Sequence, residues 1–409
     1  MSKNYRWLWV TVALVSGGWL LISLLGVLLM GVLPLIPSMG MTSADTLVFL
    51  GIFLVNSGLS LTLLAASWRA VRQHPARVLF PHWGWLILLV LLTLGLLILG
   101  GVAHDALATT LWFAPIQMAV IVLPALGLLL MLIWLSGKDH AVTGREVALT
   151  LSGGALSTLI ALPVEVVGLV ASIFVVAISA MLFPGGQEEI MRLVTEVELW
   201  QELPAGAVSM EMLAPWLGSP VVLAVLALTI AVVTPIIEEV AKTLVISVLS
   251  WRNRPSPVQG FLWGALCGLG FAMVEGIGNG GMGIGEALPW MSGIGSRVLA
   301  TAMHALVSGL IGLGWSLFWQ RRYWALPVSH LAAILFHGLW NFSVVIMLGG
   351  AGPMMVGALP TLAGTLLMLT GLALLGSLAL LAPVLLLGLP LLLRMNTAAK
   401  TPLGDPTSQ

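Results

Sequence analysis

The chain of 409 residues is 59% hydrophobic and only 8% charged, with a mean hydropathy of +1.09. Soluble domains carry about 25% charged residues, so this composition excludes a soluble globular protein and indicates an integral membrane protein. The formal net charge of zero gives no reason to expect a nucleic-acid partner, and the single cysteine, Cys267, excludes an intrachain disulfide framework.

Apolar runs of about 20 residues recur along the chain, and such runs predict membrane-spanning helices rather than the alternating strands of a barrel. We therefore expect an all-α polytopic membrane bundle of about ten transmembrane helices. The predicted spans lie near residues 9–33, 46–68, 84–103, 112–136, 148–183, 219–250, 258–280, 298–319, 325–348 and 360–393. The first run follows Lys3 and Arg6. It is too long for a signal peptide and lacks a small-residue cleavage site, so we interpret it as an uncleaved span.

The fifth, sixth and tenth runs are longer than a helix needs to cross a bilayer, so each is expected to be tilted, broken or partly outside the hydrocarbon. Pro163 and Pro235 are the natural break points of the fifth and sixth runs. The tenth run could instead form a re-entrant pair.

Lysine and arginine residues indicate how the chain is oriented. With the N-terminus inside, thirteen of the 16 basic residues fall on the inner side, Arg192 and Arg297 fall outside, and Lys242 lies within a span. Basic loops remain preferentially in the cytoplasm. We therefore predict a multi-pass protein of the plasma or inner membrane with both termini cytoplasmic.

The long loop at 184–218 is predicted to lie on the outer side. Its stretch "QEEIMRLVTEVELWQEL" places apolar side chains on one helical face, which predicts an amphipathic helix at the membrane interface. The domain organisation that we expect is a five-helix scaffold or substrate-selecting region at 1–183, this loop at 184–218, a catalytic four-helix core at 219–350, a C-terminal transmembrane helix at 351–395 and a disordered tail at 396–409.

A few ionisable residues fall inside predicted spans, where each costs roughly 2.5–3.5 kcal/mol at the bilayer centre on insertion scales. They are Glu165, Glu238, Glu239, Lys242, Glu275, His304 and His337, whereas Glu286 is assigned to an outer loop. So many costly groups are expected to share one functional site.

Helical spacing shows which of these side chains can meet. Glu238 and Lys242 are four residues apart and Glu239 is three residues from the same lysine, so one cation serves two carboxylates. In the next span, the glycines at 260, 264 and 268 form a ridge that lets another helix approach closely, and Glu275 continues this ridge. In the ninth span, His337 and Asn341 lie on one stripe.

These residue types suit the hydrolysis of a carbonyl compound. Of two adjacent carboxylates, one can act as a general base toward water, while a histidine donates a proton and Asn341 stabilises an oxyanion. Alternatively, carboxylates and neutral imidazoles suit Zn²⁺ or another divalent metal ion, which lowers the pKa of a bound water. Both routes end in water attacking a carbonyl.

The motifs "EEVAK", "FAMVE", "HALVSG" and "HGLWN" occur in this order on four consecutive spans. In this respect the chain resembles the PrsW family of intramembrane proteases, which is related to the wider CAAX-prenyl-protease and Abi group. Lys242 and Glu275 stand where the wider group has an arginine and a histidine, which favours the PrsW branch. The resemblance covers roughly residues 219–348.

The resemblance implies an intramembrane endopeptidase that cleaves membrane proteins, such as a single-span anti-sigma factor. Its candidate catalytic residues are Glu238, Glu239, Lys242, Glu275, His304, His337 and Asn341, and its candidate metal ligands are Glu239, Glu275, His304 and His337. Two other classes stay open. Intramembrane Glu, Lys and His residues also build the relays of proton-coupled transporters, and a noncatalytic membrane scaffold could retain the motifs.

Overall fold

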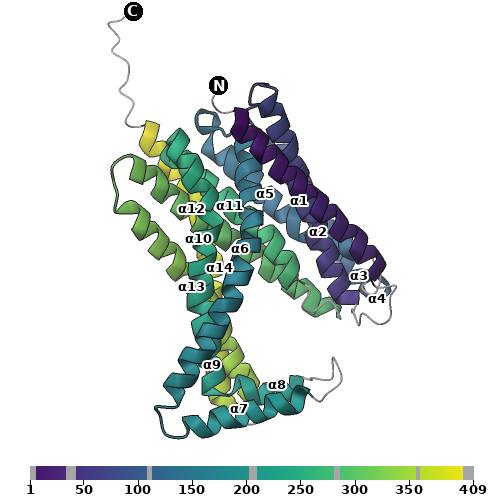
Figure 1. The fold of residues 1–409 in the computed structure, drawn as a ribbon, viewed down its shortest axis with the longest axis vertical. Helices are drawn as coiled ribbons and strands as arrows, with labels where there is room; N and C mark the ends of the chain where they lie inside the picture. The colour runs from purple at the N-terminus through teal and green to yellow at the C-terminus, as the bar shows by residue number, and fades with distance from the viewer. Residues whose placement is uncertain are drawn as a thin grey trace, which may run out of the picture. The chain divides into compact units, whose positions relative to one another are not determined.

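The computed structural model describes residues 6–33, 43–107, 113–201, 210–280, 286–355 and 360–398. Within these ranges the regular secondary structure is helical, apart from an isolated antiparallel β-bridge between Val78 and Thr143. Ten of the described helical segments are long and apolar enough to cross a membrane (Figure 1). The prediction of an all-α bundle with ten spans is confirmed, and the protein is a multi-pass membrane protein.

The helices follow one another along the whole chain. Their bounds are α1 (Arg6–Val32), α2 (Ser43–Val71), α3 (Trp83–Val102), α4 (His104–Leu107), α5 (Phe113–Ser136), η4 (Lys138–His140), α6 (Gly144–Ala180), α7 (Gly186–Gln201), α8 (Met210–Leu217), α9 (Pro220–Leu228), η5 (Thr229–Val233), α10 (Thr234–Asn253), α11 (Pro257–Asn279), α12 (Ala287–Trp319), α13 (Ala325–Met355) and α14 (Thr361–Ala398).

The chain divides into two compact units. The first comprises Met1–Thr158, Ala241–His330 and Ala382–Gln409, and the second comprises Leu159–Val240 and Leu331–Leu381. All four boundaries between the units fall inside helices, so α6, α10, α13 and α14 each contribute residues to both units.

The core of the first unit is α11, whose residues are almost all buried, packed along α12 (Figure 1). A Cβ atom added at Gly260, Gly264 or Gly268 would lie 2.5, 2.1 or 2.2 Å from a backbone oxygen of α12. The two backbones therefore touch along the glycine ridge, as the sequence predicted. Ser256 and Gln259 form a capping box that fixes where α11 begins.

The long helices differ from expectation at their prolines. α6 continues through Pro163, and α14 continues through Pro383 and Pro390, so the break at Pro163 and the re-entrant pair are wrong. Unwinding a helix inside a membrane would leave still more backbone groups without partners, whereas neighbouring groups can re-satisfy those that a proline frees, so a helix there tolerates proline. The sixth span does break, but as the π-helix η5, which ends two residues before Pro235.

Two boundaries also need correction. α12 begins at Ala287 rather than near 298, directly after Glu286, so Arg297 lies inside the helix. α14 extends to Ala398, which shortens the predicted tail, and residues 399–409 lie outside the described ranges.

The 184–218 segment contains the predicted amphipathic helix, α7, followed by the short α8. Arg192 of α7 forms ion pairs with Glu189 at 2.7 Å and Glu196 at 2.6 Å. Glu189 also accepts a hydrogen bond from Ser219, the residue that caps the start of α9. These contacts hold α7 against the first turn of the sixth span.

Candidate active site

The break in the sixth span leaves one backbone carbonyl without a helical donor. The N–H of Thr234 donates to Thr229, five residues back, so it is not available to Ile230. The next residue, Pro235, has no N–H. Asn341 of α13 supplies the missing donor, since its Nδ2 lies 2.8 Å from the carbonyl oxygen of Ile230.

Gly338, in the neighbouring turn of α13, also packs closely against the π-helix η5. A Cβ atom at Gly338 would lie 2.5 Å from the carbonyl oxygen of Ala231, so only glycine fits there. Gly338 and Asn341 therefore fix α13 against the π-helical turn that precedes Glu238 and Glu239.

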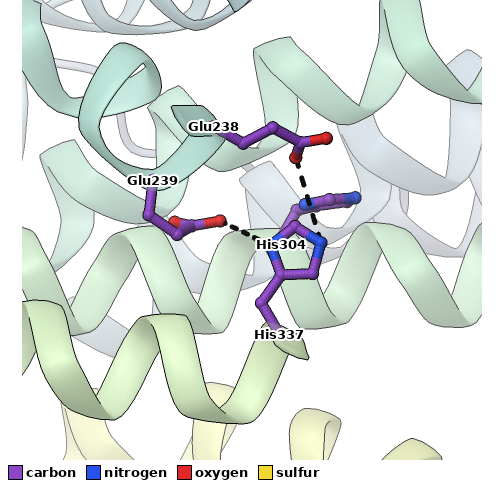
Figure 2. Close-up of side chains that lie close together, drawn as sticks. All are labelled: Glu238, Glu239, His304 and His337. Carbon is purple, nitrogen blue, oxygen red and sulfur yellow. Dashed lines mark hydrogen bonds and ion pairs between the residues drawn. The ribbon is translucent and has the colours of Figure 1, made fainter. Parts of the chain in front are cut away.

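His337, on the same helix as Asn341, lies beside both of these glutamates. Its Nδ1 is 2.9 Å from Oε1 of Glu239, and its Nε2 is 3.9 Å from Oε2 of Glu238 (Figure 2). All three residues are buried, and Glu239 is fully so. An ionised carboxylate only accepts hydrogen bonds. In a neutral His337 the proton is therefore on Nδ1, which donates a hydrogen bond to Glu239. Nε2 then carries the lone pair.

A second carboxylate and imidazole pair lies in the first unit. Nε2 of His304 is 2.7 Å from Oε2 of Glu275, and Nδ1 of His304 is 2.8 Å from Nζ of Lys242. Because an ammonium group only donates, Nδ1 accepts from Lys242 and Nε2 donates to Glu275. His304 is therefore held as a neutral imidazole between a cation and an anion.

Further side chains of the first unit hold this chain of contacts in place. Glu275 accepts from Asn279 at 2.7 Å and pairs with Arg297 at 3.4 Å. The ammonium of Lys242, which is fully buried, lies 4.1 Å from the ring centroid of Phe271, a cation–π contact. A buried cation needs such partners because removing its hydration is costly.

Sequence spacing could have identified these supporting residues. Asn279 follows Glu275 by four residues and Arg297 precedes His304 by seven, so each lies on the same helical face as a predicted site residue. Phe271 precedes Glu275 by four residues and so shares the same helical face.

One helix carries charged residues of both units. Glu238 and Glu239 belong to the second unit and Lys242 to the first, yet all three lie within about one turn of α10. The i,i+3 and i,i+4 relations predicted from the sequence therefore hold along an unbroken helix.

Four of the buried residues could hold a metal ion: Glu238, Glu239, His304 and His337 (Figure 2). This group contains Glu238, whereas the sequence prediction had Glu275 in its place. Glu275 instead contacts Nε2 of His304. Two carboxylates and two imidazoles form a donor set that suits Zn²⁺. Each imidazole is oriented by a carboxylate on its other nitrogen, as in known metal sites.

The other polar residues singled out in the sequence do not take part in these Glu–His contacts. Asn341 reaches the backbone of Ile230, as described above. Glu165 is half-buried in α6, and Glu286 directly precedes α12 without a side-chain capping bond.

Part of the chain matches a known protein family. Residues 200–374 match the family described as PrsW family intramembrane metalloprotease, a range that covers less than half of the chain. No curated protein and no solved structure matches the chain. The matched range contains all seven candidate catalytic residues, which are Glu238, Glu239, Lys242, Glu275, His304, His337 and Asn341.

Proposed function

We propose that this protein is an intramembrane endopeptidase that hydrolyses peptide bonds of membrane-protein substrates by means of a glutamate-activated water. The observation that carries the proposal is the pair of Glu–His contacts, Glu239 with His337 and Glu275 with His304, on helices long enough to span a membrane. The match to a family of intramembrane metalloproteases supports the same activity.

The contacts suggest different roles for the glutamates. Glu239 and Glu275 each accept a hydrogen bond from a histidine, so we assign them to orienting His337 and His304. Glu239 is thus the glutamate that orients His337, and we assign its neighbour Glu238, whose Oε2 lies 3.9 Å from Nε2 of His337, as the general base.

The proposed reaction balances in two steps. Glu238 accepts a proton from water while the water oxygen bonds to the carbonyl carbon of the substrate, and negative charge develops on the carbonyl oxygen. The carbon–nitrogen bond then breaks, and the proton held by Glu238 passes to the leaving nitrogen. The buried positive charge of Lys242 is proposed to stabilise the developing oxyanion.

We propose that Glu239, His304 and His337 supply three ligands for a divalent metal ion, and that Glu238, the fourth residue of this group, remains the general base. Zn²⁺ is the best match to these donors. When bound, the ion supplies Lewis acidity, which lowers the pKa of a water molecule. Nδ1 of His304 would have to exchange its hydrogen bond from Lys242 for the ion. His337 offers Nε2, because Glu239 engages its Nδ1.

The proposed substrate is a membrane protein with a single span, comparable to an anti-sigma factor, in the plasma or inner membrane. The helices α1 to α6 lie outside the matched range, so we propose that they form a scaffold or select substrates.

Co-expression with candidate single-span proteins tests the activity. Cleavage fragments are expected with the native chain, and Glu238→Gln is expected to reduce cleavage roughly 10²–10⁴-fold because the general base is lost. Glu239→Gln keeps an oxygen that can accept from His337, so its loss is expected to be smaller, about 10–100-fold.

Glu188→Gln is the matched control, since Glu188 is exposed on α7 and lies outside the site. Full cleavage by both the Glu238 and Glu239 variants, at equal protein levels, would end the proposal. Treatment with a chelator should abolish cleavage and Zn²⁺ should restore it. Cleavage that resists chelation would leave the glutamate-activated water without a metal.

A further inference from the structure

A pocket of about 230 Å³ lies in the first unit where α2 ends and α6 begins. It is lined by Ala66, Arg69, Pro75, Ala76, Arg77, Leu79, Gly144 and Arg145. Three of these eight residues are arginines and none is acidic. None of them belongs to the proposed catalytic set.

Backbone hydrogen bonds build the wall of this pocket. Gly144 N donates to Arg77 O at 2.9 Å, and Leu79 N donates to Val142 O at 2.9 Å. Arg145 also lines the pocket, and its Nη2 donates to the carbonyl oxygens of Arg69 and His74. These hydrogen bonds join the segment after α2 to the start of α6, and so they fix the backbone that carries the three arginines.

The positive charges around the pocket are not neutralised by carboxylates. Within the described ranges, none of Arg69, Arg77 and Arg145 forms an ion pair with an acidic side chain. The acidic residue nearest in sequence, Glu146, accepts hydrogen bonds from the N–H and hydroxyl of Thr143 and so caps α6. Like charges held together without a counterion favour an anionic ligand.

We propose that this pocket binds the phosphate group of an anionic ligand, with Arg69 and Arg77 as its main contacts. Guanidinium groups bind phosphate oxygens in a bidentate manner and form strong charge-assisted hydrogen bonds. The positive end of the α6 dipole at Gly144 adds to the attraction.

The surroundings of the pocket favour a lipid headgroup as the source of the phosphate. Trp68, Phe80 and Trp83 are 52%, 41% and 61% exposed beside it in the sequence. Exposed aromatic residues at the ends of spans mark the depth of lipid headgroups. A small soluble phosphate compound has the same chemistry, and the experiment below separates the two sources.

Arg72 provides a matched control. It lies at the same end of α2 and carries the same charge, but it stacks on Trp68 at 4.8 Å and does not line the pocket. Arg72→Gln thus removes one inner-side charge without changing the pocket. Arg145 is left unchanged in these variants because it also holds the backbone of the segment after α2.

Native mass spectrometry of the purified full-length protein tests the proposal, with phosphatidylglycerol, diacylglycerol and inorganic phosphate added separately. We expect phosphatidylglycerol to bind to the native chain and to Arg72→Gln, and diacylglycerol not to bind at this site. The double variant Arg69→Gln/Arg77→Gln should bind phosphatidylglycerol at least about tenfold more weakly, because two charge-assisted contacts are lost.

Inorganic phosphate that binds with the same dependence on Arg69 and Arg77 would support the site and indicate a soluble ligand. Equal losses in Arg72→Gln and in the double variant would show that only net charge matters and would overturn the proposal, as would binding that none of the variants weakens. Unchanged thermal unfolding without lipid verifies the fold. If the double variant unfolds, Arg77→Gln alone, at an exposed position, gives the same comparison.

Discussion

Asn341 illustrates how one side chain can be read in two ways. The sequence suggested an oxyanion donor, whereas the structure places its amide nitrogen on the carbonyl of Ile230. That carbonyl has no helical donor, because Thr234 donates elsewhere and Pro235 lacks an N–H. We therefore propose that Asn341 is a positioning residue that holds the π-helical turn before Glu238 and Glu239.

Replacement of Asn341 separates these two roles. Asn341→Ala leaves a half-buried carbonyl without its donor, so unfolding should become easier by about 1–3 kcal/mol, and cleavage should fall with it. Ser343→Ala on the same helix removes only a local bond to Trp340 and serves as the control. Thermal unfolding and cleavage rates are the measurements. Normal stability with lost cleavage would favour the oxyanion role instead.

The two Glu–His pairs likewise depend on contacts of single side chains. Each histidine has a carboxylate on one nitrogen and a lone pair on the other, which fixes the tautomer that a ligand or base needs. Simple counting of charged residues could not assign these partners, because His337 and Glu239 are 98 residues apart in the chain.

At the scale of elements, the contact between α11 and α12 depends on the absence of side chains. A Cβ at Gly264 would lie 2.1 Å from the carbonyl oxygen of Ser308, whereas one at Gly278 on the same helix meets nothing closer than 4.0 Å. Gly264→Ala should therefore force the helices apart and destabilise the protein by about 1–3 kcal/mol.

Gly278→Ala should leave the thermal unfolding temperature nearly unchanged or raise it slightly, since alanine favours helix. Equal unfolding temperatures for the Gly264 and Gly278 variants would contradict the close approach. The comparison is sharp because both substitutions add the same single methyl group to the same helix.

The attachment of α7 to α9 should respond to pH. Hydrogen bonds from Arg192 lower the pKa of Glu189 to about 2, with a further contribution from Ser219. A carboxyl group whose pKa is lowered on folding stabilises the folded state fully above its unfolded pKa of about 4.3. This stabilisation is lost as the pH falls through the folded value of about 2.

Hydrogen exchange of α7, corrected for intrinsic rates, should therefore show unchanged protection from pH 7 to about pH 5 and a loss toward pH 2. Glu189→Gln should reduce this protection already at pH 7, while Glu188→Gln, at an exposed position of the same helix, should not. Protection that disappears between pH 7 and pH 5 would show that another group controls the contact.

At the scale of the whole molecule, ten candidate spans are an even number, which places both termini on one side of the membrane if all of them cross it. With both termini in the cytoplasm, thirteen of the 16 lysine and arginine residues lie on the cytoplasmic side, as the positive-inside rule favours. Reporter fusions at each terminus should therefore be active only as cytoplasmic reporters. Activity of either fusion on the outer side would require a different number of crossings.

The sequence by itself determined the helical class, the ten spans, the glycine ridge and the set of ionisable residues inside the membrane. These follow from local physics, since bilayer thickness sets the length of an apolar run, helical periodicity sets its faces, and the cost of burying charge makes Glu238, Lys242 and His304 conspicuous.

Only the tertiary structure decided which carboxylate meets which imidazole, that Asn341 reaches Ile230, and that the sixth span breaks at a π-helix while α6 and α14 run through their prolines. Such choices depend on how neighbouring helices rotate and pack against one another. A proline offers the option of a break, but the contacts of the adjacent helix determine whether the freed carbonyl finds a donor.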